Sequence, residues 1–163
     1  MSGPQLQGKV AIVTGAAGGF GEGIARLFVA EGAKVLIADL DADKAQQVAA
    51  ALGAQARSVR CDVSKRADID AALKACVDAF GAPDIVVNNA GTTHRNQSML
   101  DVDEATFDRV FAVNVKSIYH MTQAVVPLMQ ARRSGVIINI GSTAGIRPRP
   151  GLVWYNATKG AVN

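Results

Sequence analysis

The sequence predicts an α/β fold built around a doubly wound parallel sheet, and three observations support this. Five short apolar runs of strand length alternate with longer stretches in which apolar residues recur at helical spacing. A glycine-rich turn joins the first of these runs directly to the first helical stretch. Aromatic residues make up only 5% of the chain, which suits helices packed closely on a sheet better than a β-sandwich.

The first half of the chain repeats a strand followed by a helix. Residues 9–14 (KVAIVT) form a short apolar run between two glycines, which is typical of a central strand buried on both faces. Residues 19–31 follow with helical spacing and end at Gly32, a residue type that commonly closes helices. The same reasoning predicts strands over 33–39 and 57–61, a helix over 41–52 that ends at Gly53, and a helix marked by Ile69, Leu73, Cys76, Val77 and Phe80 that ends at Gly81.

The second half continues the alternation with a longer helical stretch. Residues 84–87 and 136–140 are apolar runs that predict the fourth and fifth strands. Between them, residues 103–131 present one apolar helical face on which the polar Asn114 also lies, and a last helix begins near Val153. Right-handed crossovers predict the strand order 3-2-1-4-5 in one domain over residues 1–163, with the fifth strand at an open edge.

Composition excludes several classes of function. The net charge of +3 comes from 17 basic and 14 acidic residues that are scattered along the chain, which predicts no nucleic-acid partner. No segment approaches the ~20 apolar residues of a membrane span and no signal peptide precedes the domain, so we expect no membrane and a cytoplasmic location. Cys61 and Cys76 are expected to be buried thiols. His94 and His120 lack companions at metal-ligand spacing, so no metal site is expected.

The glycine-rich turn, residues 14–21, predicts a dinucleotide site. Its glycines let the backbone approach a pyrophosphate, which the N–H groups at the start of the following helix can bind. Glycine can also serve helix-strand packing alone, but the position of this turn between the first strand and the first helix favours the binding role.

Asp39, at the end of the second strand, predicts the type of dinucleotide. Its carboxylate lies about 20 residues past the glycines, where it can accept both hydroxyls of an adenine ribose. It would repel a 2′-phosphate, and neither Gly18 nor Leu40 supplies a cation to hold one, so NAD is favoured over NADP. The alternative is that Asp39 only starts a turn, a role that Asp41 can fill equally well.

With these motifs in place, the chain resembles the short-chain dehydrogenase/reductase family from Gly8 to Asn163. Residues 14–21 are similar to its TGxxxGxG turn, and residues 88–91 to its NNAG segment. Asn114, Ser142, Tyr155 and Lys159 resemble its catalytic group. The resemblance implies a Rossmann fold that binds NAD through Gly15, Gly19, Phe20, Gly21, Asp39, Leu40, Asp62, Val63, Asn89, Ala90, Gly91, Tyr155 and Lys159.

The chemistry of the proposed catalytic group can be argued from the residues themselves. Tyr155 and Lys159 are four apart on one helix face, and a neighbouring ammonium favours the phenolate form of a tyrosine. Tyr155 can therefore act as general base in oxidation and general acid in reduction. Ser142 can hydrogen-bond the substrate oxygen. Asn114 needs partners because it lies among apolar residues; in the family the corresponding residue helps to hold a water chain that leads to the lysine.

The resemblance implies a hydride transfer between NAD and a small secondary alcohol or ketone, in a protein that forms homodimers or homotetramers. One alternative is a reductase of 3-oxoacyl groups on acyl carrier protein, for which Arg147 and Arg149 would attract the acidic partner. Another is a nucleotide-binding fragment without catalysis. Family members usually continue through a further helix, two strands and the substrate-binding loop, so we expect the C-terminal part of the domain to be missing from residues 1–163.

Overall fold

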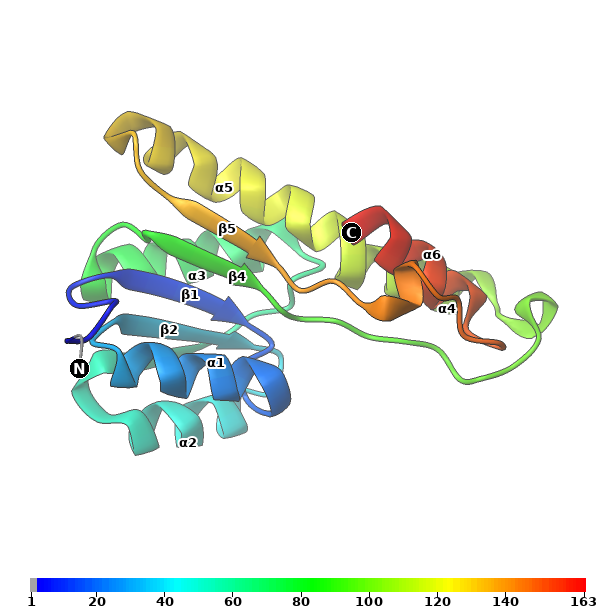
Figure 1. The fold of residues 1–163 in the computed structure, drawn as a ribbon, viewed down its shortest axis with the longest axis horizontal. Coiled ribbons are helices and arrows are strands. Elements are labelled where there is room, and N and C mark those ends of the chain that lie inside the picture. Colours follow the sequence, from blue (N-terminus) through cyan, green and yellow to red (C-terminus); the bar gives the residue numbers. More distant parts are fainter. Residues whose placement is uncertain (1–2) are drawn as a thin grey trace.

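The fold is a five-stranded parallel sheet with helices on both faces, and the order of its strands is the one that the sequence predicts. The computed structural model describes residues 3–163. The strands lie in the order β3-β2-β1-β4-β5, which confirms the doubly wound α/β architecture (Figure 1). All neighbouring strands pair in parallel. The strands are β1 (Val10–Thr14), β2 (Lys34–Asp39), β3 (Ala56–Arg60), β4 (Ile85–Asn88) and β5 (Val136–Asn139).

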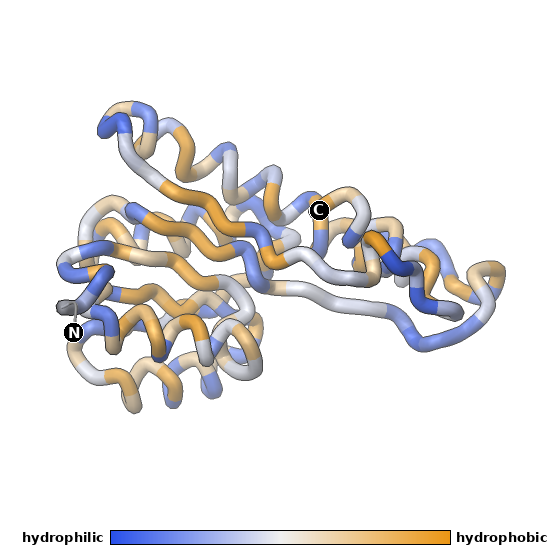
Figure 2. The backbone as a smooth tube through the Cα atoms, in the orientation of Figure 1, coloured by the Kyte–Doolittle hydropathy of each residue, from blue (hydrophilic) through white to orange (hydrophobic). Residues whose placement is uncertain are grey.

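The two faces of the sheet are covered by different pairs of helices. Helices α1 (Gly19–Ala30) and α2 (Ala42–Leu52) lie on one face, and α3 (Arg66–Phe80) and α5 (Ser117–Arg132) lie on the other (Figure 1). Because side chains alternate along a strand, neighbouring residues of β1 enter different cores. Ile12 packs on the α3 and α5 side, whereas Val13 packs on the α1 and α2 side. Figure 2 shows the strands as the most hydrophobic part of the chain.

The predicted long helix is continuous but locally distorted. It consists of α4 (Glu104–Phe111), a π-helical segment (Ala112–Lys116) and α5. The side chain of Asn114, in the middle of the π-helical segment, is only 2% exposed. π-Turns are rare and frequently occur at functional sites.

An arm made of α4 and α6 (Val153–Val162) extends beyond the carboxyl ends of the strands (Figure 1). Phe107 of α4 packs edge-on against Trp154 of α6, with the ring centroids 5.0 Å apart. Three short 3₁₀ turns, which the sequence analysis does not predict, connect the longer elements. They are Gly53–Gln55, Met99–Asp101 and Thr143–Gly145.

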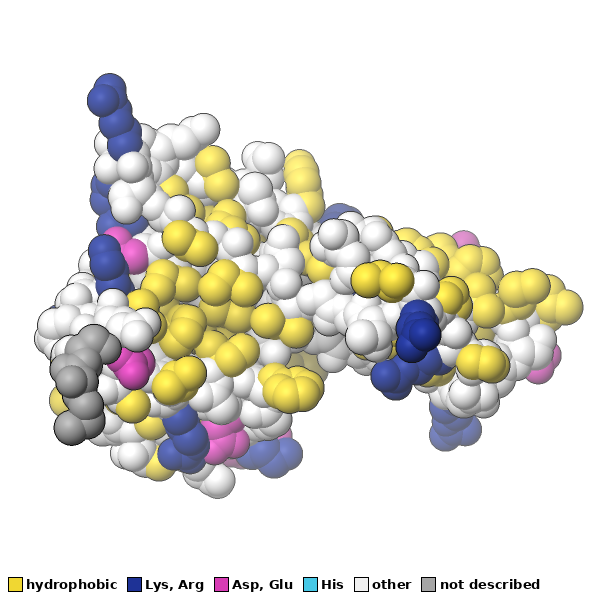
Figure 3. All heavy atoms as spheres, viewed as in Figure 1, with side chains coloured by type: hydrophobic (Ala, Val, Ile, Leu, Met, Phe, Trp, Pro, Cys, Tyr) yellow, Lys and Arg dark blue, Asp and Glu magenta, His cyan; other side chains and the backbone are white. Residues whose placement is uncertain are grey.

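An open apolar face lies over β4 and β5, beside α1 (Figure 3). It is formed by Leu27, Phe28, Ile85, Val136 and Ile138, which line a cavity of about 380 Å³. Val136 and Leu27 are more than half exposed, and β5 is the edge strand, as the sequence predicts. Within residues 3–163, no helix has both the length and the apolar character needed to cross a membrane.

Candidate functional site

A cavity of about 710 Å³ lies at the carboxyl ends of the strands, where open α/β sheets bind ligands. Its walls come from the glycine-rich turn, from the ends of β2 and β3, from the segment after β4 and from α4 with the π-helical segment. It is lined by Gly15, Ala17, Gly18, Phe20, Asp39, Leu40, Asp41, Lys44, Cys61, Asp62, Val63, Asn89, Ala90, Gly91, Thr92, Arg109 and Val113. This set includes nine of the predicted cofactor-binding residues. The remaining four, Gly19, Gly21, Tyr155 and Lys159, are not among the lining residues.

The glycines of the turn serve two different purposes. Gly15 has a φ of 63°, and a Cβ there would lie 2.8 Å from Ala90 Cα, so this glycine permits close packing of the turn against the segment after β4. A Cβ at Gly21 would collide with Gly15 O. At Gly18 and Gly19, by contrast, a Cβ would meet nothing within 4 Å. No side chain caps the start of α1 at Gly18, so the first N–H groups of the helix are available to an anion.

Thr14 and Asn89 brace the turn against β4. Thr14 Oγ1 accepts hydrogen bonds from the backbone N–H groups of Asn89 and Ala90, both at 3.0 Å. Asn89 Nδ2 donates to Thr14 O at 2.8 Å and to Gly15 O at 2.9 Å. The side chain of Asn89, which the sequence analysis assigns to the cofactor, is therefore engaged in holding the turn to the end of β4.

Asp39 is positioned by two backbone N–H groups. One carboxylate oxygen accepts from Ala17 N at 2.9 Å, and the other accepts from Asp41 N at 3.0 Å. The carboxylate is thereby fixed between the glycine-rich turn and the start of α2. Leu40 follows with an exposed side chain beside the cavity.

A cation that was not predicted lies in this region. The preference for NAD was predicted from the positions of Gly18 and Leu40, neither of which supplies a cation to hold a 2′-phosphate. The structure corrects that premise, because Lys44 of the first turn of α2 lines the same cavity. Its Nζ lies 2.8 Å from Asp41 Oδ2. Lys44 was not predicted because it does not follow a strand directly. It lies in the first turn of α2, which places it beside the end of β2.

The end of β3 forms the next part of the wall. Asp62 Oδ1 accepts a hydrogen bond of 2.6 Å from Ser64 Oγ, and this bond holds the pKa of the Asp62 carboxyl below its usual value. Val63 is buried beside it. Val113 and Arg109, one turn apart on the long helix, complete the cavity and were not predicted.

Asn114 joins three segments that are far apart in the sequence. Its Oδ1 accepts from Thr92 N at 2.8 Å, and its Nδ2 donates to Thr92 O at 2.8 Å and to Thr158 Oγ1 at 2.9 Å. The amide thus has the partners that its burial requires. Two of its bonds go to backbone, as a purely structural asparagine would make, while the third fixes α6.

Lys159 is buried next to Asn114. Its Nζ donates to Ile140 O at 2.8 Å. A Cβ added at Gly91 would lie 3.5 Å from Asn114 Oδ1 and 3.8 Å from Lys159 Nζ. The amide and the ammonium therefore both approach Gly91, the glycine of the NNAG segment, which lines the cavity.

Tyr155 and Ser142 lie on the elements around Lys159. Tyr155 is half-buried on α6, one turn before Lys159, and Thr158 Oγ1 donates to its carbonyl at 2.7 Å. Ser142 lies on the loop after β5, where its Oγ accepts from Ala144 N at 3.1 Å. The loop between them is fixed by Asn156, whose side chain bonds both the N–H and the C=O of Arg149.

The two cysteines are buried, as the sequence predicts. Burial raises the pKa of each thiol, Cys61 and Cys76, to about 12. Among residues 3–163, no three His, Cys, Asp or Glu side chains gather in a way that would hold a metal ion.

The comparisons with known proteins agree with this fold. The family model for short chain dehydrogenases matches residues 9–163. The chain is 49% identical over 160 residues to 4-formylbenzenesulfonate dehydrogenase of Comamonas testosteroni, covering 96% of this chain and 64% of that protein. It is 45% identical over 159 residues to galactitol 2-dehydrogenase of Agrobacterium fabrum, covering 97% and 62%. The chain thus spans less than two thirds of the length of these curated relatives.

Two solved structures have the same arrangement of elements. A 3-ketoacyl-(acyl-carrier-protein) reductase from Brucella melitensis, complexed with NADH, superposes with a TM-score of 0.94 at 48% identity, covering 97% of this chain and 67% of the other. A short chain dehydrogenase/reductase from Burkholderia phymatum, in complex with NAD, gives 0.92 at 33% identity, covering 97% and 57%.

Proposed function

Because the chain belongs to the short-chain dehydrogenase family, we propose that the protein transfers hydride between NAD and a small secondary alcohol or ketone. One observation carries the proposal. Asn114 ties the helix of Tyr155 and Lys159 to Thr92, which lines the nucleotide-sized cavity. This link would hold the proposed proton-transfer groups near a dinucleotide site.

The residues of the cavity fit NAD. Gly18 and Gly19 leave open space at an uncapped helix start, where a pyrophosphate finds N–H donors. Asp39 would accept the hydroxyls of the adenine ribose, and Asp62 and Val63 would contact the adenine. When bound, the nicotinamide ring supplies the site that accepts or releases a hydride.

The chain's own residues would handle the proton. In oxidation, the phenolate of Tyr155 would accept the proton of the substrate hydroxyl, and a bound oxidised nicotinamide would supply the acceptor for the hydride of the carbon that bears this hydroxyl. Lys159 would favour the phenolate by its charge, and Ser142 would donate a hydrogen bond to the substrate oxygen. In reduction, Tyr155 would return the proton to that oxygen.

A preference for NAD over NADP is part of the proposal. The fixed carboxylate of Asp39 would repel a 2′-phosphate, and the Asp41 carboxylate adds to that repulsion. The two similar structures described above contain NADH and NAD, which supports the same choice.

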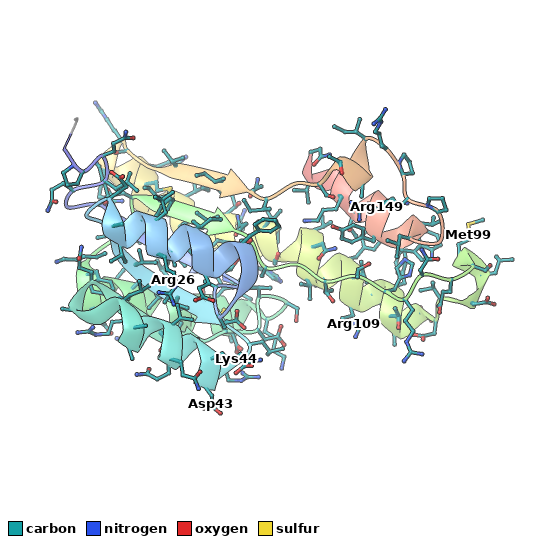
Figure 4. All side chains as sticks on the ribbon, turned by 60° about the horizontal axis from the view of Figure 1, so that its bottom comes forward. Arg26, Asp43, Lys44, Met99, Arg109 and Arg149 are labelled. Carbon is teal, nitrogen blue, oxygen red and sulfur yellow. The ribbon has the colours of Figure 1, made fainter. Side chains whose placement is uncertain are left out.

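A second candidate is reduction of 3-ketoacyl groups on acyl carrier protein. Arg147 and Arg149 are exposed on the loop before α6, where Arg149 projects from the arm (Figure 4). Cations there could face an acidic carrier protein. For either activity we propose a cytoplasmic homodimer or homotetramer that associates through α5 and α6.

The test is an assay of the full-length protein. Titration with NADH should raise the cofactor's fluorescence with saturation, and NAD should be reduced in the presence of a polyol such as galactitol or of an aromatic alcohol. Activity confined to acetoacetyl groups on a carrier protein would favour the second candidate. No binding of either nicotinamide cofactor would contradict both.

A further inference from the structure

We propose that Asp41 and Lys44 form a second control of cofactor choice, in which Asp41 holds Lys44 away from a 2′-phosphate. The inference rests on the proposed binding of a nicotinamide dinucleotide. In this arrangement Lys44 could bind a 2′-phosphate, but its charge is neutralised by Asp41. Asp41 therefore adds to the selectivity for NAD that Asp39 provides.

The three charged groups form one contiguous cluster. Asp41 N donates to Asp39 Oδ1 at 3.0 Å, and Lys44 Nζ lies 2.8 Å from Asp41 Oδ2. All three residues line the same cavity. A ribose whose hydroxyls were held by Asp39 would therefore have both Asp41 and Lys44 as its neighbours.

The net charge of this cluster is negative, so the cluster repels a phosphate. Two carboxylates, Asp39 and Asp41, face one ammonium, which leaves a net charge of −1. The hydrogen bond between Asp41 and Lys44 lowers the pKa of the Asp41 carboxyl and raises the pKa of the Lys44 ammonium, so both stay charged at neutral pH. Loss of the Asp41 charge would bring the cluster to neutrality and leave the ammonium without a partner.

The ion pair between Asp41 and Lys44 is exposed to solvent, so Lys44 can leave Asp41 for another anion. The side chains of Lys44 and Asp41 are 68% and 43% exposed. Exposed ion pairs contribute little, and a phosphate dianion offers an ammonium the same kind of charge-assisted hydrogen bond as a carboxylate does, with a larger negative charge. Lys44 can therefore exchange partners at little cost once the competing carboxylate is removed.

Other nearby cations are less suited to this role. Arg26 of α1 pairs with Glu22, and Lys65 faces Asp62 at 3.7 Å. Besides Lys44, the described lining of the cavity contains one other basic residue, Arg109. Arg109 lies on α4, in the arm, whereas Lys44 lies on α2 in the main body of the fold (Figure 4).

Asp41 can be changed without removing the helix cap. Its Oδ1 accepts a hydrogen bond from Lys44 N at 3.1 Å and so caps α2. Asparagine and serine cap helices as well as aspartate does, but they carry no charge. Asp43 offers a matched control, because it lies in the same turn, carries the same charge and points away from the body of the molecule (Figure 4).

The experiment measures the Kd of NADPH and of NADH by fluorescence in the full-length protein and in Asp41→Asn, Asp41→Ser, Asp43→Asn, Lys44→Met and Asp41→Asn/Lys44→Met. Both Asp41 variants should bind NADPH about three- to tenfold more tightly, with NADH changed less than about twofold. Asp43→Asn should change neither. The gain should vanish in the double variant and should shrink at high ionic strength.

Each outcome bears on the inference. An equal gain from Asp43→Asn would show that only net charge matters and would overturn it, as would a gain that persists without Lys44. No gain in either Asp41 variant, with normal NADH binding, would overturn this inference and leave the proposed function standing. Failure of the unmodified protein to bind either cofactor would overturn both.

Discussion

Asn114 Nδ2 donates a 2.9 Å hydrogen bond to Thr158 Oγ1, and this bond joins the π-helical segment to the helix that carries Tyr155 and Lys159. Because the same amide also bonds both backbone groups of Thr92, it links α6 directly to the wall of the nucleotide cavity. The position of Tyr155 and Lys159, the proposed proton-transfer groups, relative to that cavity therefore depends in part on this residue.

Replacing Asn114 by alanine should lower both stability and turnover. The variant leaves Thr92 N, Thr92 O and Thr158 Oγ1 without their buried partner, which should cost about 1–3 kcal/mol of the free energy of unfolding. Chemical denaturation checks the first effect and steady-state kinetics the second. Gln47→Ala, at an exposed position of α2, is the control and should change neither. Full activity of Asn114→Ala would contradict the anchoring role.

Tyr155→Phe should abolish turnover while NADH binding stays nearly unchanged. The lost hydroxyl transfers a proton, and general acid–base groups contribute about 10²–10⁴-fold to rate. Steady-state rates and a fluorescence titration measure the two quantities separately. Tyr119→Phe, at a 59% exposed position of α5, removes a phenol hydroxyl outside the cavity and should retain activity while sedimentation shows the oligomeric state of the unmodified protein. Equal losses in both variants would argue against the assignment.

Asp39→Ala should narrow the gap between the affinities for NADH and NADPH. The change removes the carboxylate that would bind the ribose hydroxyls and repel a 2′-phosphate, so NADH should bind more weakly and NADPH more tightly. Titration of both reduced cofactors measures the gap. Asp78→Ala removes a carboxylate on α3 that pairs with Lys74 and should leave the gap unchanged. If the difference between the NADH and NADPH affinities is the same in Asp39→Ala, Asp39 does not control the choice of cofactor.

Gly18→Ala and Gly21→Ala should fail in different ways. At Gly18 the φ of −177° is open to any residue and the new methyl group meets open space, so the variant should fold normally but bind NADH more weakly. At Gly21 the methyl group collides with Gly15 O, so the variant should lose about 1–3 kcal/mol of stability. Thermal unfolding and NADH titration distinguish the two. The same outcome in both variants would contradict the division of roles.

Stability should fall as the pH rises from about 9 toward 12. Burial raises the pKa of Cys61 and Cys76 from 9.0 to about 12, so the folded state keeps protons that the unfolded state loses. The contribution is complete below pH 9 and is lost as the pH approaches the folded value. Urea unfolding at pH 8 and pH 10.5 measures it, and Cys76→Ala should weaken the dependence. An identical pH dependence in that variant would refute this account.

The strands and their order could be predicted because the signals are local and strong. Each strand is an apolar run bounded by turn residues, and the glycines after the first three helices all have positive φ, namely Gly32, Gly53 and Gly81. Right-handed crossovers then leave few ways to arrange the strands. The short 3₁₀ turns, such as Met99–Asp101, carry no comparable periodic signal and were not found.

The residues that line the cavity were predicted mainly where a sequence motif lies at the end of a strand. Residues that follow strands, such as Asp39 and Asp62, could be placed because strand ends meet at one edge of the sheet. Lys44 and Arg109 reach the same cavity from helices, and their orientation depends on how each helix turns relative to the sheet. That rotation depends on tertiary packing, which a sequence pattern does not contain.

The π-helical segment also limits how the gene for this protein can change in length. Val110 before it and Met121 after it are both almost fully buried, and the segment accommodates the residues between them. A π-turn holds one residue more than an α-turn, so deleting one residue here would close it to a regular α-turn and keep α4 and α5 in register. The apolar face of α5 would then keep its place, but Asn114 would lose the distorted backbone on which its contacts depend. Exposed positions of this helix should accept many substitutions, but the number of residues from Val110 to Met121 should be invariant in any functional variant.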